Sequence, residues 1–165
     1  MDPIANLQAE HVVALEKLDA LESVIKTLER GGSPEAVATV SDVIAFLNAE
    51  LELHIRKEEE ALFPPLDVMI GSGLGPTAVM RMEHNDLKAR RDALKAALDR
   101  KIATEMAPPA GEIIGILREH IEKEEYVLFP LTRSALSPEQ LQAIGAEFAA
   151  IEEAAAAHPR TATAR

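Results

Sequence analysis

The sequence predicts an all-α protein, an antiparallel up-down four-helix bundle with an additional C-terminal helix. Strong helix formers dominate the 165 residues, which include only four Phe, one Tyr and no Trp. Apolar residues recur at alternating steps of three and four in four successive segments, which is the spacing of one helix face. Short breaks rich in Gly and Pro separate these segments, so neighbouring helices should run antiparallel in one domain with a hydrophobic core.

The first two helices are predicted on either side of the break Gly31-Gly32-Ser33-Pro34. Ser33 suits a helix N-cap, and Pro34 suits the first position of the helix that follows. The first apolar stripe comprises Ile4, Leu7, His11, Ala14, Leu18, Leu21, Ile25 and Leu28. The second comprises Val37, Val40, Ile44, Leu47, Leu51, His54, Glu58 and Ala61.

The third helix follows a second break, Ile70–Pro76, and a third break, Met106–Gly111 (MAPPAG), separates it from the fourth. Arg91 interrupts the third stripe, which comprises Met80, His84, Leu87, Leu94 and Leu98. The fourth stripe comprises Ile113, Leu117, His120, Glu124, Val127 and Leu131. Four of the five histidines and two glutamates therefore lie at apolar positions of predicted helices.

A fifth helix is predicted over residues 138–157, because Ser137 and Gln140 are spaced for a capping box at its start. Its apolar face could cover either the bundle or a dimer partner, so a monomer and a weak homodimer both remain open. That face comprises Leu141, Ile144, Phe148 and Ile151. We expect residues 1–157 to form the domain and residues 158–165 to form a disordered tail.

Charge and composition exclude several classes of function. The net charge is −11, with 28 acidic against 17 basic residues, which argues against nucleic acid or an anionic membrane as a partner. The absence of cysteine excludes disulfides, zinc fingers, iron–sulfur ligation and thiol chemistry. No stretch approaches the roughly 20 apolar residues of a membrane span. The first ten residues, MDPIANLQAE, lack the pattern of a signal peptide, so we expect a cytoplasmic protein.

The two halves of the sequence repeat each other. HIRKEEEALFP, which begins at His54, matches HIEKEEYVLFP, which begins at His120, at eight of eleven positions. Upstream of each, a Glu-His pair recurs at His11 and at His84. The repeated unit is therefore a pair of helices with one histidine on its first helix and His-x-x-x-Glu on its second.

This repeat predicts a metal site on the bundle axis. Residues four apart share a helix face, so each His-x-x-x-Glu pair can reach one point. Alone, a histidine on an apolar face is usually a hydrogen-bonded core residue, but a duplicated set in phase with the stripes favours metal ligation. A cation would offset the cost of burying two carboxylates, and imidazole with carboxylate suits iron or manganese, and zinc less specifically. Six ligands fit two ions bridged by both carboxylates.

The order His, HxxxE, His, HxxxE, with LFP after each HxxxE, resembles the hemerythrin-like HHE cation-binding domain over residues 4–132. The resemblance implies a similar four-helix bundle around two iron ions joined by an oxo or hydroxo bridge. It implies His11, His54, His84 and His120 as terminal ligands and Glu58 and Glu124 as bridging ligands.

Two departures separate this sequence from the oxygen-carrying hemerythrins that it resembles. Those proteins have a further histidine four residues after the third one, where this chain has Lys88. They also place the last carboxylate five residues after its histidine, which corresponds here to Glu125. The internal repeat favours Glu124, and Glu125 remains an alternative. Otherwise Glu59 and Glu125 are expected on the solvent side of the ligands, and Glu60 at the surface.

The missing histidine shapes the expected function. Each iron would have five ligands and one open position, which favours redox reaction with hydrogen peroxide, nitric oxide or oxygen over reversible oxygen carriage. The sequence thus predicts a di-iron oxidoreductase of oxidative or nitrosative stress defence, and no catalytic residue is assigned. The alternative is a non-catalytic module that binds, stores or senses iron or oxygen. Iron–sulfur-cluster repair proteins share this ligand set, but they carry an added cysteine-containing region, and its absence here disfavours that role.

Three side chains near the ligands have two interpretations each. Lys88 can extend to solvent, or it or Arg91 can donate a hydrogen bond near the open position. Tyr126 can pack in the core or at its rim, or it can supply a proton or an electron.

Overall fold

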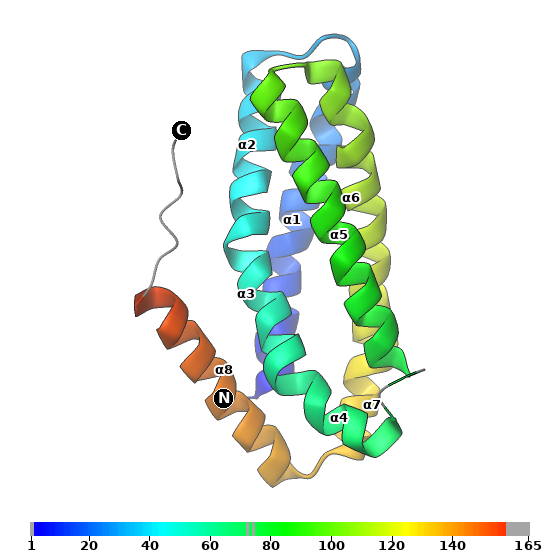
Figure 1. Cartoon of the computed structure of the whole chain (residues 1–165), viewed down its shortest axis with the longest axis vertical. Helices are drawn as coiled ribbons and strands as arrows, with labels where there is room; N and C mark the ends of the chain where they lie inside the picture. The colour runs from blue at the N-terminus through cyan, green and yellow to red at the C-terminus, as the bar shows by residue number, and fades with distance from the viewer. Residues whose placement is uncertain (1, 72, 74, 158–165) are drawn as a thin grey trace.

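The computed structural model describes residues 2–71, 73 and 75–157 and shows helices arranged as an antiparallel bundle (Figure 1). The first and third rods of the bundle are α1 (Pro3–Glu29) and α5 (Pro76–Arg100). The second consists of α2 (Pro34–Asn48), α3 (Glu50–Lys57), the π-helix η1 (Glu58–Leu62) and α4 (Phe63–Ile70). The fourth consists of α6 (Ala103–Lys123), the π-helix η2 (Glu124–Leu128) and α7 (Phe129–Ala135). The additional helix, α8 (Pro138–Ala157), crosses one end, which confirms the predicted fold class.

Most predicted helix boundaries are confirmed by their caps. The Ser33 hydroxyl accepts a hydrogen bond from the Ala36 amide at 3.1 Å, as expected of an N-cap. At the start of α8, the Ser137 amide donates to the Gln140 side chain at 2.9 Å, and the Gln140 amide donates back to the Ser137 hydroxyl at 3.3 Å. This reciprocal pair is the predicted capping box. The second break is also confirmed, because α4 ends at Ile70 and α5 begins at Pro76.

The predicted break at residues 106–111 is wrong. The chain turns earlier, at Lys101, which adopts a left-handed conformation with φ of 58°. From Ala103 onward α6 continues through Pro108 and Pro109. Each proline removes one helical N–H donor, but Pro109 and its neighbours Met106, Ala107 and Ala110 are buried in the bundle. Burial of this face outweighs the local preference for a break.

The two π-helices change which residues face the core. In each, the amide of the following phenylalanine bonds to the carbonyl five residues earlier, Phe63 to Glu58 and Phe129 to Glu124. The wider turn accommodates the proline that follows each phenylalanine. It also adds a residue to the turn, so Val127, predicted in the core, is 54% exposed, and Leu128 is buried in its place.

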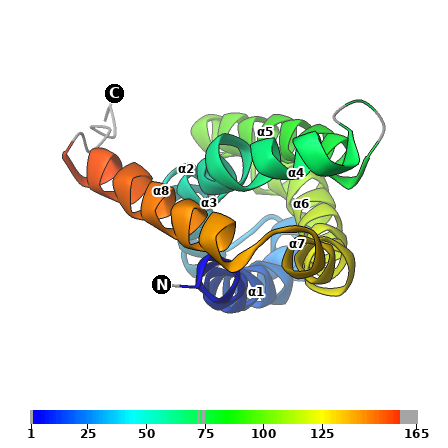
Figure 2. The same ribbon diagram turned by 90° about the horizontal axis from the view of Figure 1, so that it is seen from below.

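Two hydrophobic clusters lie on either side of the histidine layer. One fills the bundle between α1, α2, α5 and α6, where the predicted positions Ile25, Val37 and Leu98 are only partly buried. The other joins the opposite ends of the rods to α8, which buries Ile144 and Phe148 against them (Figure 2). The C-terminal helix therefore covers its own bundle, whereas the predicted tail, 158–165, lies outside the described residues.

Among the described residues, no helix has both the length and the apolar character needed to cross a bilayer.

Candidate metal centre

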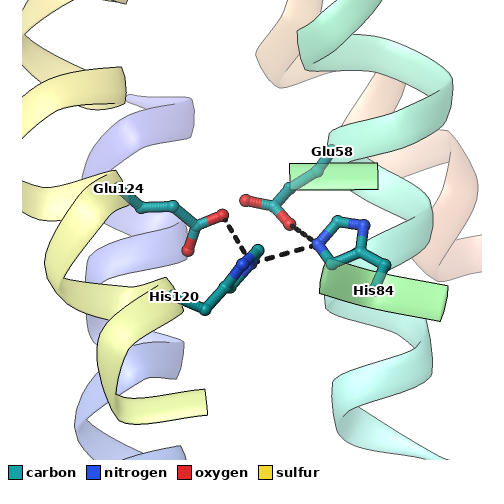
Figure 3. A group of neighbouring side chains, drawn as sticks. All are labelled: Glu58, His84, His120 and Glu124. Atoms are coloured by element: carbon teal, nitrogen blue, oxygen red, sulfur yellow. Dashed lines mark hydrogen bonds and ion pairs between the residues drawn. The ribbon is translucent and has the colours of Figure 1, made fainter. Parts of the chain in front are cut away.

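The six predicted ligands meet at one level of the bundle, between α1, α3, η1, α5, α6 and η2. Each of these residues is at most 4% exposed, and both glutamates are fully buried. Figure 3 shows four of them converging from three of the rods. The full set is His11, His54, Glu58, His84, His120 and Glu124.

Each carboxylate lies between two imidazoles. One Glu58 oxygen is 3.6 Å from Nε2 of the histidine one turn before it, and the other is 3.2 Å from Nε2 of His84. The two Glu124 oxygens are each 3.0 Å from an Nε2 atom, one from the preceding histidine, His120, and one from His11. Because each carboxylate has two oxygens directed at different histidines, its geometry is compatible with a bridging role.

The histidines form two pairs, one from each half of the repeat. The rings of His11 and His54 have centroids 5.0 Å apart, and those of His84 and His120 have centroids 4.8 Å apart. The second pair together with both glutamates offers ligand atoms within 4.8 Å of one another, and so does the first pair with Glu124. The arrangement therefore contains two adjacent positions where a metal ion could be held.

A second layer of carboxylates holds the outer nitrogen of every imidazole. Nδ1 of His11 lies 2.7 Å from Glu125, and Nδ1 of His84 lies 2.7 Å from Glu59. The Nδ1 atoms of the other two histidines lie 2.8 Å from Glu10 and from Glu83. With Nδ1–H donating outward, each Nε2 presents a lone pair to the centre, which is the tautomer that a metal requires.

This second layer refines the sequence analysis in two ways. Glu125 is 26% exposed and faces the outer side of His11, whereas Glu124 is fully buried and faces inward, so the geometry favours Glu124 as the ligand. Glu59 lies on the expected outer side. The roles of Glu10 and Glu83 were not anticipated, although the repeated Glu-His pair was the signal that marks them.

Two lysines in turn hold Glu10 and Glu83. Lys57, at the same place in its repeat as Lys123, forms an ion pair with Glu10, and Lys123 forms one with Glu83. Lys123 is 43% exposed, whereas Lys57 is fully buried beneath α8. Sequence reasoning missed this pair of lysines, although His-x-x-Lys occurs in both halves.

Five buried polar atoms of the centre lack a hydrogen-bond partner. Both oxygens of Glu58, both oxygens of Glu124 and Nε2 of His11 are buried without a hydrogen-bond partner. Unpaired buried carboxylates are costly, so either protons or a cation must lie among these atoms. A set of four imidazoles and two carboxylates, without thiolate, fits iron or manganese, and zinc less specifically.

The pKa values show how strongly the cluster attracts positive charge. Burial alone would lower the pKa of His54, but the Glu58 charge and the hydrogen bond to Glu10 outweigh burial and raise that pKa to about 10. For His120, burial is likewise outweighed, chiefly by Glu124, and its pKa rises to about 9. Burial would raise the pKa of Glu58, yet His54 and His84 hold it well below its usual range. A metal ion would displace the imidazole protons.

The side chains with two interpretations lie outside the centre. Lys88 and Arg91 both approach Glu52, at 3.7 Å and 3.3 Å, which supports the solvent-side position for each. The expected packing of Tyr126 is wrong, because the side chain is 81% exposed on the outer face of η2.

Sequence comparison finds one family and several curated relatives. The profile of the hemerythrin HHE cation-binding domain matches residues 2–132. Iron-sulfur cluster repair protein YtfE of Enterobacter sp. (strain 638) is 35% identical over 101 residues, 53% of this chain and 44% of that protein. The protein of the same name from Edwardsiella ictaluri (strain 93-146) is 29% identical over 143 residues, 77% of this chain and 61% of that protein. The chain thus spans about half the length of these relatives.

Proposed function

The chain belongs to the hemerythrin HHE cation-binding family, and from this premise we propose that it is a non-haem di-iron protein that reacts with hydrogen peroxide, nitric oxide or oxygen. The observation that carries the proposal is the pair of fully buried glutamates whose four oxygens have no hydrogen-bond partner. Their position between two histidine pairs supports two ions, and the nitrogen and carboxylate donors support iron ahead of manganese or zinc.

Each residue of the centre has a distinct role in this proposal. One ion would be held by His11 and His54 and the other by His84 and His120. Glu58 and Glu124 would serve both ions, and an oxo or hydroxo group would complete the bridge. The outer carboxylates fix the imidazole tautomers, so the ligand nitrogens are directed inward before any ion enters.

The ligand count supports reaction over reversible binding. A pair of iron ions supplies two electrons and coordination positions that a small molecule can occupy. The chain provides two histidines for each ion, and Lys88 pairs with Glu52 at the surface. Both ions would therefore keep an exchangeable position, which favours a role in oxidative or nitrosative stress defence.

A second candidate is a non-catalytic module that stores, senses or delivers iron. Its support is the name of the relatives, which refers to repair of iron–sulfur clusters. Repair of a cluster consumes iron, so a protein that holds two ions between carboxylates could act as the donor. A cytoplasmic location is part of both proposals.

The test separates the two candidates. Protein reconstituted anaerobically with ferrous iron should hold two iron ions per chain and, once oxidised, should show near-ultraviolet charge-transfer absorption. Peroxide should then decay faster than with the same concentration of free iron. A stoichiometry of one or zero would contradict the di-iron proposal, and full loading without accelerated decay would favour iron storage or delivery.

A further inference from the structure

A cavity of about 140 Å³ lies against the histidine layer. One end is polar and is lined by the four ligand histidines and Glu124. Apart from Glu10 and Glu50, the rest of the lining is apolar, and it includes Ala14, Phe46, Leu51, Leu87, Leu117 and Ile121.

The apolar end lies one helical turn from the metal ligands. On α1 and α5, Ala14 and Leu87 each follow the ligand histidine of their helix by three positions. On the antiparallel rods, Leu51 of α3 and Leu117 of α6 each precede the ligand histidine by three positions. All four residues are therefore displaced in the same direction along the bundle, toward the α1–α2 connection (Figure 1). Ions held by the inward nitrogens and oxygens would leave this region free.

The two halves of the repeat differ at this level. Leu51 corresponds to Leu117, but Ala14 corresponds to Leu87, so α1 contributes a methyl group where α5 contributes a full leucine. The cavity extends toward this smaller side chain. Its lining there includes Val13, 37% exposed, and the exposed Glu50, so the cavity is reached from solvent between α1 and α3.

The volume of about 140 Å³ includes the histidine end, where bound ions would lie, so the apolar part is smaller than the whole cavity. A water molecule occupies about 30 Å³ of liquid, whereas an apolar cavity of about 150 Å³ can bind benzene. The lining is also asymmetric, because the buried polar partners lie at the histidine end, whereas Glu50 is exposed at the opening to solvent. A matching ligand would have one small polar group and a short alkyl group.

We propose that this cavity binds the alkyl group of an organic hydroperoxide and directs its O–O group to the histidine end. The inference rests on the proposed function, since it names a substrate class for the same centre. In the reaction the O–O bond breaks, and the products are an alcohol and water. This reduction needs two electrons, which a bound pair of ferrous ions would supply, and two protons from solvent.

The first test measures the cavity without relying on turnover. Crystals of the oxidised, iron-loaded protein are exposed to xenon under pressure, because xenon occupies dry apolar cavities of this size. We expect a xenon atom beside Ala14 in the unmodified protein and none in Ala14→Leu, which installs the side chain that the repeat carries at Leu87. Ala20→Leu, at an exposed position on the same helix, should retain the xenon site.

The second test measures selectivity in a single turnover. The ferrous protein is mixed with tert-butyl hydroperoxide or with hydrogen peroxide, and the rates of iron oxidation are compared. The ratio of the two rate constants should fall about tenfold in Ala14→Leu, because the alkyl group loses its buried contacts. It should not change in Ala20→Leu. If Ala14→Leu does not fold, Leu87→Ala replaces it, and enlarging the cavity should shift selectivity toward the bulkier cumene hydroperoxide.

The outcomes separate this inference from the proposed function. If neither peroxide reacts faster than it does with free iron, the proposed redox function fails. If hydrogen peroxide reacts but the ratio is the same in Ala14→Leu or Leu87→Ala as in the unmodified protein, the cavity does not select alkyl groups. Absence of xenon from the unmodified protein would also overturn the inference.

Discussion

Replacing Lys57 by methionine tests whether α8 and the metal centre are joined through a buried charge. The Lys57 ammonium donates to Asn6 at 2.8 Å and to Glu152 at 2.9 Å, pairs with Glu10, and lies 5.4 Å from the centre of the Phe148 ring. Methionine is similarly long and unbranched, so the substitution removes the charge and its hydrogen bonds with little change of shape.

The expected loss can be worked from the exposure of the partners. Removing one member of a buried ion pair costs about 3–5 kcal/mol when the remaining charge is fully buried. Glu10 and Glu152 are 34% and 41% exposed, so water can replace part of what the lysine donated. We therefore expect a loss of about 2–3 kcal/mol. For a chain of this size, that loss lowers the melting temperature by roughly 4–12 °C.

The repeat provides a matched control in Lys123→Met. Its side chain is 43% exposed and pairs with Glu83 alone among the described residues, so the expected loss is below about 1 kcal/mol. Both variants are unfolded with urea at the same iron loading and followed by circular dichroism. Hydrogen exchange should show loss of protection in α8 for Lys57→Met only. Equal losses for the two variants, or unchanged exchange in α8, would refute this account of the buried lysine.

Three further outcomes follow from the centre itself. His54→Ala should lower iron content and melting temperature together, because Glu58 loses a compensating partner. The control His158→Ala should alter neither, and equal effects of the two variants would contradict the ligand assignment. Metal-free protein should lose stability as the pH rises from about 6.5 through 9–10. The pKa values of His54 and His120 are raised to about 10 and 9 in the folded protein, so their protonated forms stabilise the fold below that range. Calorimetry should then show that the stabilisation by iron grows with pH, and a constant difference would contradict it. Lys88→His should slow the peroxide reaction, because it adds an imidazole one turn after His84. Unchanged kinetics in a variant whose structure shows the added nitrogen bound would contradict this.

The sequence alone predicted the bundle and the six residues at its centre because both depend on local helical geometry. Stripes with steps of three and four define which face of each helix is buried, and His-x-x-x-Glu places two ligands one turn apart on that face. The duplication then distinguished the predicted ligand set from isolated core histidines. The capping box at Ser137 and Gln140 is local in the same sense, and the structure confirms it.

Local signals failed where packing or backbone geometry outweighed them. Proline in MAPPAG predicted a break, but the buried face around Pro109 keeps α6 continuous. A regular helical period placed Val127 in the core, whereas the π-turn that begins at Glu124 rotates it outward. The continuity of α6 is not encoded in a short window, because it depends on what the neighbouring helices bury.

The contacts of the outer layer of the centre were decided by tertiary structure. Glu125 holds a histidine on α1, and Glu59 holds one on α5, so each contact joins residues that only bundle assembly brings together. The burial of Lys57 depends on where α8 docks, and the cavity beside Ala14 depends on the side chains of all four rods. Helical periodicity determines the direction of a side chain relative to its own helix. The position of that helix against its partners determines what the side chain meets.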